Sequence, residues 1–203
     1  MYKPILFNGD MVRAILDGRK TQTRRVIRPK FRENEAGYQV ISNLCTGQFI
    51  RIEYYDEYEE VTRYMAPPCS PGDIMWVRET WHKDAGRYMY RANYSKDEKF
   101  YRNGQEVTLR WHPSIHMPKE AARIFLRVKS VHLERLRDAR DSQCMAEGVT
   151  CSWNVDLRDA FAALWDSTIK PAERAAYGWN ANPWVWVIEF ERCEKPERWC
   201  EHD

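Results

Sequence analysis

The strongest constraint on this chain is a change of pattern at Gly18, where a helical repeat stops and an alternating pattern begins. The apolar residues before it recur at helical spacing and are Met11, Val12, Ile15 and Leu16. Asn8 or Asp10 can cap this helix, and a glycine ends it because glycine readily takes the left-handed conformation of a C-terminal cap. The polar run of residues 18–25 therefore lies at a helix-to-strand junction, a place where functional groups tend to gather.

Residues 22–28 alternate as a strand with two chemically different faces. One face carries Thr23, Arg25 and Ile27, and the other carries Arg24, Val26 and Arg28. Lys20 precedes this strand and is crowded by arginines, which disfavour its charged form. We therefore expect the pKa of Lys20 to be lowered.

The rest of the chain predicts more strands than helices. We expect strands over 74–81, 124–136 with a bulge near Ser130, and 183–190, and helices over 138–147 and 154–169. Residues 29–66 and 83–112 are charged, tyrosine-rich and weakly patterned, and we interpret both as insertions. The first insertion has possible strands near 37–42 and 48–55. The pattern predicts one α+β domain over 1–203, with a curled β-sheet decorated by helices.

Composition excludes some classes of protein. The hydrophobic fraction is 43% and the aromatic fraction 13%, values typical of a globular chain. No apolar run reaches the roughly 18 residues that a membrane span needs, and the start is too short and too polar for a signal peptide. The cysteines are irregularly spaced, so we expect reduced thiols in a cytoplasmic protein. They are Cys45, Cys69, Cys144, Cys151, Cys193 and Cys200.

The net charge is only +2, but the charges are unevenly distributed. Residues 13–32 hold eight Lys or Arg and one acid, whereas residues 53–60 hold five acids and no base. The basic segment suggests a local site for an anion such as a nucleic-acid backbone. A solvated charged face is the alternative interpretation.

Two groupings of histidine and cysteine resemble metal motifs but do not meet their requirements. His112 and His116 have a proline between them, and Cys193, Cys200 and His202 do not supply four ligands at zinc-site spacing. No phosphate loop, dinucleotide glycine pattern or nucleophile elbow occurs. We predict neither a metal nor a cofactor.

The pattern Gly18-x-Lys20-x-x-Thr23-x-Arg25 resembles the signature of ASCH domains, small members of the PUA-like superfamily. Further segments resemble the longer ASCH proteins of phage and prophage genomes, and they span residues 71–73, 76–81, 113–118, 146–148 and 182–190. The resemblance implies a PUA-like curled β-barrel with a cleft suited to RNA or a nucleobase. The segments near 29–66 and 83–112 would be insertions in it.

Some small bacterial members of the family hydrolyse the acetyl amide of N4-acetylcytidine with a lysine, a threonine and a glutamate. By position, the resemblance assigns these catalytic roles to Lys20, Thr23 and Glu147. In amide hydrolysis Thr23 would supply the nucleophilic hydroxyl and a neutral Lys20 would accept its proton. Glu147 would orient the lysine or donate a proton to the leaving amine.

Each of these residues also has an ordinary structural interpretation. Lys20 could be a solvated turn lysine, Thr23 a plain strand residue, and Glu147 a surface acid before a capping glycine. Residues three apart on a regular strand point to opposite faces, so Lys20 and Thr23 converge only if residues 20–22 form a turn or bulge.

A second group of residues is predicted to bind substrate or nucleic acid. The group consists of Arg19, Arg24, Arg25, Glu79, Trp81 and Trp179. Arginines, Arg28 among them, suit phosphate, and an exposed indole suits a stacked base. Trp81, Trp179 and Trp184 lie at element ends and are candidates for ligand contact, whereas Trp76, Trp165 and Trp186 are predicted to be core residues.

These residues predict an RNA- or nucleoside-directed hydrolase, and an amidohydrolase acting on N4-acylated cytidine is the leading hypothesis. An RNA-cleaving enzyme could use the same cleft. A non-catalytic module that binds RNA or a modified base is a further alternative. The last alternative is an accessory factor that binds a host or phage protein through the acidic residues 53–60.

Overall fold

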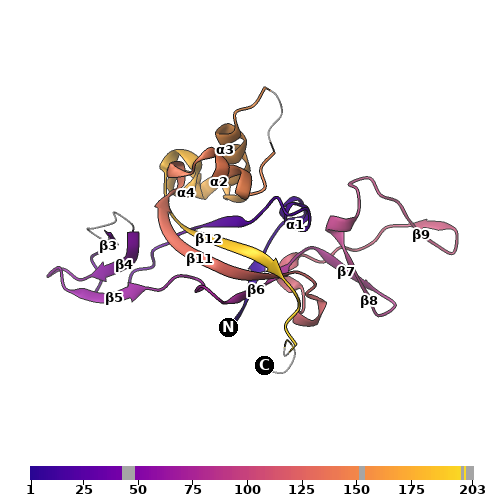
Figure 1. Cartoon of the computed structure of the whole chain (residues 1–203), viewed down its shortest axis with the longest axis horizontal. Helices are drawn as coiled ribbons and strands as arrows, with labels where there is room; N and C mark the ends of the chain where they lie inside the picture. Colours follow the sequence, from indigo (N-terminus) through magenta and orange to yellow (C-terminus); the bar gives the residue numbers. More distant parts are fainter. Residues whose placement is uncertain (43–48, 151–153, 198, 200–203) are drawn as a thin grey trace. The chain divides into compact units, whose positions relative to one another are not determined.

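The structure is a computed structural model that describes residues 1–42, 49–150, 154–197 and 199 (Figure 1). The chain forms two compact units, and each is discontinuous in sequence. Unit 1 consists of Met1–Lys20, Gly72–Arg127 and Glu191–Asp203, and unit 2 of Thr21–Pro71 and Val128–Phe190. The division falls between Lys20 and Thr21, inside the polar run at the helix-to-strand junction.

Unit 1 begins with β1 (Tyr2–Leu6), which pairs in parallel with β6 (Ile74–Arg78). The first residues of β11 (Phe125–Arg135) pair antiparallel with β6 on its other side. Helix α1 (Gly9–Leu16) is capped by Asn8, whose Oδ1 accepts from the Met11 N–H at 2.9 Å. Gly18 follows with a φ of +74°, so the predicted glycine stop is confirmed.

The second predicted insertion, residues 83–112, lies in unit 1 and contains small hairpins. β7 (Trp81–Asp84) pairs with β8 (Arg87–Tyr90), and β9 (Phe100–Arg102) pairs with β10 (Gln105–Val107). Short 3-10 turns connect these elements and are η1 (Arg91–Asn93), η2 (Ser114–His116) and η3 (Lys119–Ala121). An apolar cluster stabilises the unit and contains Trp76, Met117, Ala121, Ala122, Phe125 and Trp199.

Unit 2 contains the first predicted insertion, residues 29–66, as a separate antiparallel sheet. Its strands are β3 (Gly37–Ser42), β4 (Phe49–Tyr55) and β5 (Val61–Met65). The expected strands near 37–42 and 48–55 are confirmed. β5 was not predicted, because Thr62, Arg63 and Tyr64 interrupt any apolar alternation.

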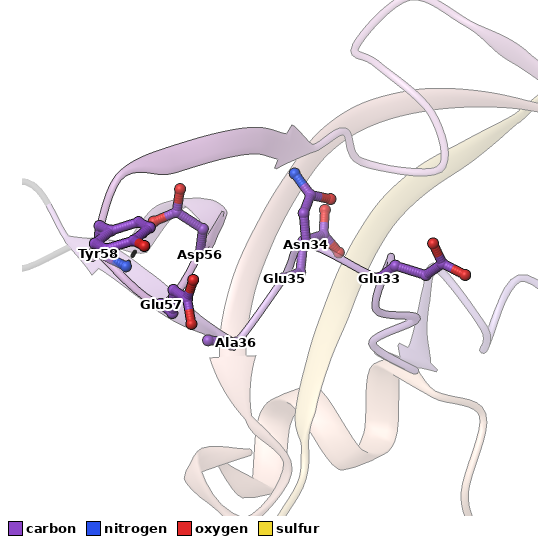
Figure 2. Close-up of a pocket in the computed structure, with 7 residues that line it drawn as sticks. All are labelled: Glu33, Asn34, Glu35, Ala36, Asp56, Glu57 and Tyr58. Carbon is purple, nitrogen blue, oxygen red and sulfur yellow. Dashed lines mark hydrogen bonds between the residues drawn. The ribbon is translucent and has the colours of Figure 1, made fainter.

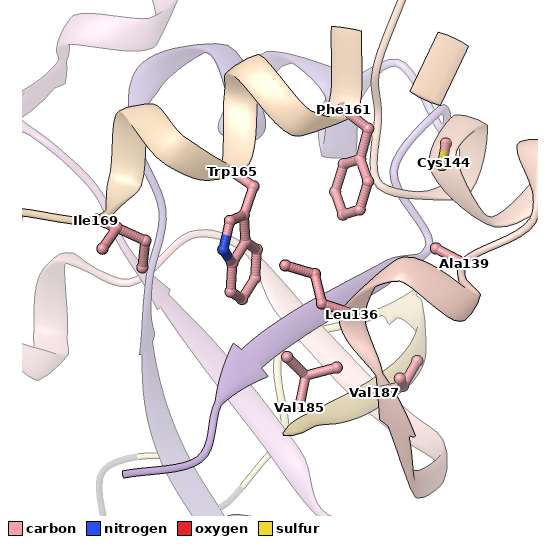
Figure 3. Packing of buried hydrophobic residues seen from close by; sticks show 8 residues of the cluster. All are labelled: Leu136, Ala139, Cys144, Phe161, Trp165, Ile169, Val185 and Val187. Atoms are coloured by element: carbon pink, nitrogen blue, oxygen red, sulfur yellow. The ribbon is translucent and has the colours of Figure 1, made fainter. Parts of the chain in front are cut away.

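The helices of unit 2 cover one face of the strand pair β2 (Gln22–Val26) and β12 (Trp184–Cys193). They are α2 (Asp141–Ala146), α3 (Leu157–Thr168) and α4 (Arg174–Tyr177), with the 3-10 turns η4 (Leu136–Asp138), η5 (Pro171–Glu173) and η6 (Trp179–Ala181). Phe161 and Trp165 point from α3 toward Leu136 and Val185 (Figure 3). Burial of this stripe supplies the main apolar stabilisation of the helices.

The opposite face of the same strands packs on the three-stranded sheet. Ile27, Trp186 and Leu133 are buried there with Ile52 and Tyr54 of β4. Val185 and Val187 belong to the helical face, whereas Trp186 between them belongs to the other face. The alternation along β12 therefore decides which of its side chains meet the helices.

The largest sheet has the strand order β1-β6-β11-β12-β2, and β11 and β12 contain residues of both units. The prediction of a mixed α+β fold rich in strands is confirmed. The predicted barrel needs correction, because the order is open and the described residues contain no closed barrel. Barrel closure requires the edge strands to pair, and the two segments predicted to be insertions form sheets of their own instead of joining this one.

Several elements are shorter than predicted. β2 ends at Val26, and the following Arg28-Pro29 step explains this because proline restricts the residue before it. β6 ends at Arg78, so Glu79 lies just beyond the strand to which the pattern assigned it. α3 begins at Leu157, where Asp156 caps it by accepting from the Arg158 N–H at 2.8 Å.

Candidate functional site

Lys20 lies in unit 1 as a buried side chain, with only 2% of its surface exposed. Its backbone N–H donates to the Ala14 carbonyl at 3.0 Å, which folds residues 18–20 back onto α1. The Lys20 amine lies 5.6 Å from the centre of the Phe7 ring. The interpretation of Lys20 as a solvated turn residue is therefore wrong. The lowered pKa expected for its amine stays a prediction.

Arg19, the neighbouring predicted binding residue, differs in its environment. Its side chain is 43% exposed, and its guanidinium forms an ion pair with Asp17 at 3.0 Å. An exposed pair of this kind is weak and leaves the guanidinium open to solvent.

Thr23 lies in unit 2 on β2, opposite Ile188 of β12. It is 2% exposed. Within residues 1–42, 49–150, 154–197 and 199 no hydrogen bond engages its hydroxyl. Because successive strand residues alternate, the Thr23 side chain points away from the face that carries Arg24.

Glu147 directly follows α2 and precedes Gly148, which has a φ of +85°. A backbone hydrogen bond from the Thr21 N–H to the Ala146 carbonyl, at 2.9 Å, ties this helix end to the start of β2. The Glu147 side chain is only 5% exposed. The interpretation of Glu147 as a surface acid is therefore wrong, although the capping glycine is present as expected.

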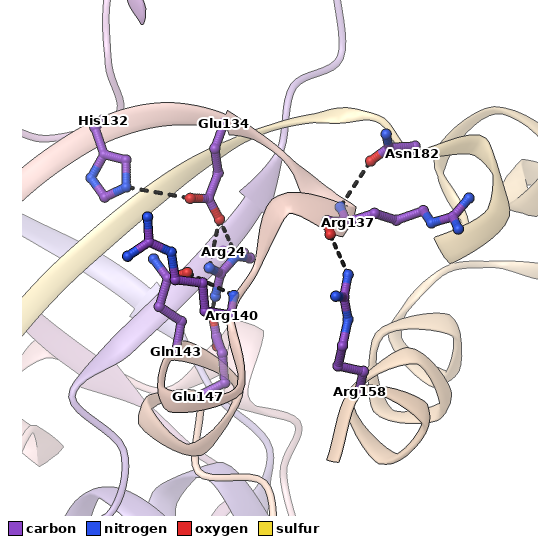
Figure 4. Close-up of polar contacts among 9 residues, drawn as sticks. All are labelled: Arg24, His132, Glu134, Arg137, Arg140, Gln143, Glu147, Arg158 and Asn182. Carbon is purple, nitrogen blue, oxygen red and sulfur yellow. Dashed lines mark hydrogen bonds and ion pairs between the residues drawn. The ribbon is translucent and has the colours of Figure 1, made fainter. Parts of the chain in front are cut away.

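Arg24 connects Glu147 to β11. Its guanidinium is fully buried and donates from Nη1 to Glu147 Oε1 at 3.0 Å and from Nε to Glu134 Oε1 at 2.8 Å (Figure 4). Nη2 also donates to Glu134. The Phe161 ring lies 5.5 Å from the guanidinium carbon. Arg24, predicted to bind phosphate, thus has two internal carboxylates as partners.

Gln22 and His132 complete this group. In the amide orientation that satisfies its neighbours, Gln22 Oε1 accepts from Nη1 and Nη2 of Arg24 at 2.8 and 3.0 Å. His132 Nε2 lies 3.6 Å from Glu134 Oε2. Burial raises the pKa of Glu134, but the stronger combined effect of His132 and Arg24 lowers it below its usual value. We call Gln22, Arg24, His132, Glu134 and Glu147 the Arg24 network.

The surroundings of Arg25 combine burial with the nearby charge of Glu147. Burial lowers the pKa of Arg25, and the charge of Glu147 opposes that shift. Arg24 and Arg25 point to opposite faces of the strand, yet Glu147 acts on both. The contact with Arg24, together with the hydrogen bond from Thr21 to Ala146, places the carboxylate beside β2, which is an end strand of its sheet.

A cavity of about 210 Å³ opens beside the start of β2. Its lining is mainly polar and consists of Thr21, Gln22, Lys129, Ser142, Gln143, Ala146, Glu189 and Phe190. Glu189 accepts from the Ser130 hydroxyl at 2.8 Å across the strands. The cavity thus adjoins the backbone link between β2 and α2.

Glu79 and Trp81 of unit 1 were both predicted to bind substrate. Glu79 is buried, and its two carboxylate oxygens accept hydrogen bonds from Nε and Nη2 of Arg123 at 2.7 and 2.9 Å. The Trp81 ring stacks on His112 at 4.8 Å. Its buried Nε1–H has no hydrogen-bond partner among the described residues.

The tryptophans of unit 2 follow the predicted division only in part. Trp165 and Trp186 are buried, as is Trp76 of unit 1, so these core predictions are confirmed. Trp179 packs edge-on against Phe161 with ring centres 5.8 Å apart, and so supports the helical core. Trp184 is half-buried beneath the guanidinium of Arg135 at 4.3 Å.

A larger hollow of about 350 Å³ lies in the first predicted insertion (Figure 2). Its lining residues are Glu33, Asn34, Glu35, Ala36, Asp56, Glu57 and Tyr58. Arg63 binds both oxygens of Glu35, and Asp56 accepts from the backbone of its own turn. Two of the acids therefore have structural roles.

Sequence reasoning missed three members of the Arg24 network, namely Gln22, His132 and Glu134. A signal for two of them was present, since His132 and Glu134 occupy alternate positions of a strand that is otherwise rich in apolar residues. Polar residues at period two on one strand face indicate a shared polar environment. Their partner from β2 is not evident from spacing.

No group of three or more metal-binding side chains occurs in the described part of the chain. Cys200 and His202, which belong to one grouping with metal-like spacing, lie outside the described residues, as do Cys45 and Cys151. Cys69, Cys144 and Cys193 form no disulfide bond among the described residues. None of the described helices has the length and apolar character needed to cross a membrane.

Comparison with protein-family models, with curated proteins and with solved structures found no match to this chain.

Proposed function

We propose that this chain is an amidohydrolase that removes the acyl group from N4-acylated cytidine, free or within RNA, through Lys20, Thr23 and Glu147. The observation that carries the proposal is their burial. Among the described residues, the polar or charged residues that are buried as whole residues are Lys20, Gln22, Thr23, Arg24, Glu53, Glu79 and Glu147. All three residues that the ASCH resemblance assigns to catalysis belong to this small group. Lysine and glutamate are seldom buried unless they are paired or functional.

The proposed reaction begins at the Thr23 hydroxyl. Its oxygen attacks the acyl carbon while the neutral Lys20 amine accepts the hydroxyl proton. The resulting tetrahedral oxyanion collapses, the bond to N4 breaks, and the Lys20 ammonium returns its proton to N4, which leaves as the amine of cytidine. Water then hydrolyses the acyl-threonine and releases the carboxylic acid.

Glu147 and Arg25 fit supporting roles in this scheme. The Oε1 atom of Glu147 receives an N–H from Arg24, which can only donate, so this oxygen acts as an acceptor. Glu147 is therefore better suited to orienting the Lys20 amine than to protonating the leaving group. Arg25 shares a strand face with Thr23 and would stabilise the developing oxyanion.

The polar cavity beside β2 would receive the cytosine ring. Its side-chain amide, hydroxyl and carboxylate groups match the mixture of donors and acceptors on a base edge. The proposal includes a PUA-like arrangement of the main sheet with two inserted segments.

Turnover of N4-acetylcytidine by the purified protein tests this function. We expect cytidine and acetate to form, and both Lys20→Ala and Thr23→Ala to reduce turnover by at least about 100-fold, the range typical of losing a proton acceptor or nucleophile. Arg102→Gln is the matched control, because Arg102 is exposed, pairs with Asp84 and is not among the predicted site residues. Absence of turnover by the native protein, or equal turnover by the Lys20→Ala variant, would reject the proposal.

A non-catalytic RNA-binding module is the second candidate, and one surface of unit 2 favours it. Arg135, Arg137 and Arg158 are exposed and form no ion pair among the described residues. The carbonyl and side chain of Asn182 accept from Arg135 Nη1 and from the Arg137 N–H, which orders this surface. Arg135 also covers Trp184. Exposed guanidiniums without a carboxylate partner, one of them over an indole, suit a nucleic-acid strand.

The second candidate predicts salt-sensitive binding of single-stranded RNA that Arg135→Ala weakens and Thr23→Ala does not change. RNA cleavage by the same cleft would instead release fragments from labelled RNA. A protein partner bound through residues 53–60 would leave the chain without RNA affinity.

A further inference from the structure

The side chain of Arg24 is a buried cation whose contacts leave it little freedom. None of its surface reaches solvent, and its N–H groups are directed at Glu134, Glu147 and the Gln22 amide. A guanidinium is planar, so contacts on several of its edges determine its orientation as well as its position. Arg24 is consequently a fixed donor inside unit 2.

Glu134 supplies the fixed counter-charge for this donor. It extends from β11 and accepts from Nε and Nη2 of Arg24, while His132 approaches its other oxygen. Together His132 and Arg24 lower the pKa of Glu134 despite its burial. Glu134 is therefore ionised at neutral pH and holds Arg24 from the side opposite to Glu147 (Figure 4).

Glu147 is at a place where a carboxylate needs such a donor. It terminates α2, a helix of six residues, and acids at a helix C-terminus oppose the helix dipole. Its backbone N–H donates to Gln143 at 3.0 Å, but that bond does not set the direction of the side chain. The Arg24 N–H contacts the carboxylate directly at 3.0 Å and so constrains its direction.

We propose that Arg24 is a positioning residue that fixes the carboxylate of Glu147 at the edge of β2, with Glu134 holding Arg24 in turn. The role in turnover rests on the proposed function. Arg24 points to the strand face opposite Thr23, so it acts on the reaction through Glu147 and does not touch the acyl group. Loss of Arg24 should therefore lower kcat and leave KM nearly unchanged.

The experiment combines kinetics with a direct measurement of the Glu147 side chain. Arg24→Lys keeps the charge but loses the planar fork, and Glu134→Gln removes the counter-charge. Arg102→Lys is the control, because Arg102 is exposed and pairs with Asp84, outside the network. We expect kcat for N4-acetylcytidine to fall about 100-fold in Arg24→Lys, the scale of a displacement of about 1 Å, and by less in Glu134→Gln. The ¹³C side-chain relaxation of Glu147 should show a carboxylate that is ordered in the native protein and mobile in Arg24→Lys.

The two measurements separate the failure of this proposal from that of the proposed function. If the native protein has no turnover but Glu147 becomes mobile in Arg24→Lys, the positioning role holds and the amidohydrolase assignment fails. If Glu147 stays equally ordered in Arg24→Lys, the positioning role is overturned whatever the turnover. A lowered kcat with an unchanged KM and a mobile Glu147 supports both.

Discussion

Each unit of this protein buries an arginine–glutamate contact, and the two contacts differ in their balance of donors and acceptors. In unit 1, Arg123 binds both oxygens of Glu79, and its remaining Nη1–H donates to Asn93 at 2.9 Å. Arg123 also lies 4.0 Å from the centre of the Tyr90 ring. One guanidinium thus serves one carboxylate, which is the arrangement expected of a structural ion pair.

In unit 2, by contrast, Arg24 is divided between two carboxylates and engages only one oxygen of Glu147. The Arg24 network therefore contains more acceptor capacity than its arginine can use. A balanced pair stabilises its immediate surroundings, whereas the shared arginine of the network couples the positions of two carboxylates. The proposed positioning of Glu147 depends on this shared arginine, whereas the pair of Glu79 and Arg123 has a structural role.

The largest expected effect comes from removing the shared arginine. Arg24→Met leaves Glu134 and Glu147 buried without their common guanidinium, and breaking such a contact costs about 3–5 kcal/mol of unfolding free energy. Urea denaturation followed by both fluorescence and circular dichroism measures it, and coincident transitions would verify two-state unfolding. Adding Glu134→Gln should recover part of the loss. A cost below about 1 kcal/mol would contradict the buried network.

Breaking the balanced pair should cost less. Arg123 is one-quarter exposed, so water can reach Glu79 partly in Arg123→Met, and we expect a loss of about 2–3 kcal/mol. Turnover per folded molecule should stay unchanged, since this pair is not assigned to the reaction. A greater loss than for Arg24→Met, or a fall in turnover, would reverse the comparison between the units.

Acid should affect the Arg24 network through Glu134. The folded-state pKa of Glu134 is lowered, so its ionisation contributes stability above the unfolded pKa, and that contribution is lost as pH falls through the folded value. Unfolding free energy measured between about pH 7 and pH 3 should therefore decline less steeply for Glu134→Gln than for the native protein. Parallel curves would show that Glu134 is not coupled to Arg24 and His132.

The smallest effect is expected at the exposed pair of Arg28 and Glu173, which are 3.2 Å apart. Arg28→Gln should change the unfolding free energy by about 0–1 kcal/mol, and added salt should reduce even that. This variant is the reference for the losses in unfolding free energy of the other variants, because it removes a guanidinium from the same chain segment as Arg24 without exposing a buried carboxylate. A loss comparable to that of Arg123→Met would remove the distinction between buried and exposed pairs.

Much of the local structure could be predicted from the chain itself. Gly18 ends α1, residues 37–42 form β3, and the alternation around Thr23 and Ile27 is present as expected. These features depend on neighbours within a few residues, where conformational preference and side-chain period act directly. The ends of β2, β6 and α3 were less predictable, because prolines, caps and tertiary contacts set them.

The partners of each charged residue could not be predicted in this way. Arg24 and Arg28 are chemically equal in the sequence, yet one is fully buried between two carboxylates and the other pairs at the surface. Glu79 and Glu147 likewise end in different surroundings. Contacts that join β2 to residues more than 100 positions away depend on how strands and helices pack, which spacing does not encode.

The sequence alone determined where the helix stops and which residues share a strand face, because these follow from local periodicity and residue type. The choice of Lys20, Thr23 and Glu147 came instead from the resemblance to ASCH domains. The tertiary structure decided that Lys20, Thr23 and Glu147 are buried and that Arg24 lies between Glu134 and Glu147. The physical reason is that desolvation and ion pairing act through space, so they depend on contacts made only when distant segments come together.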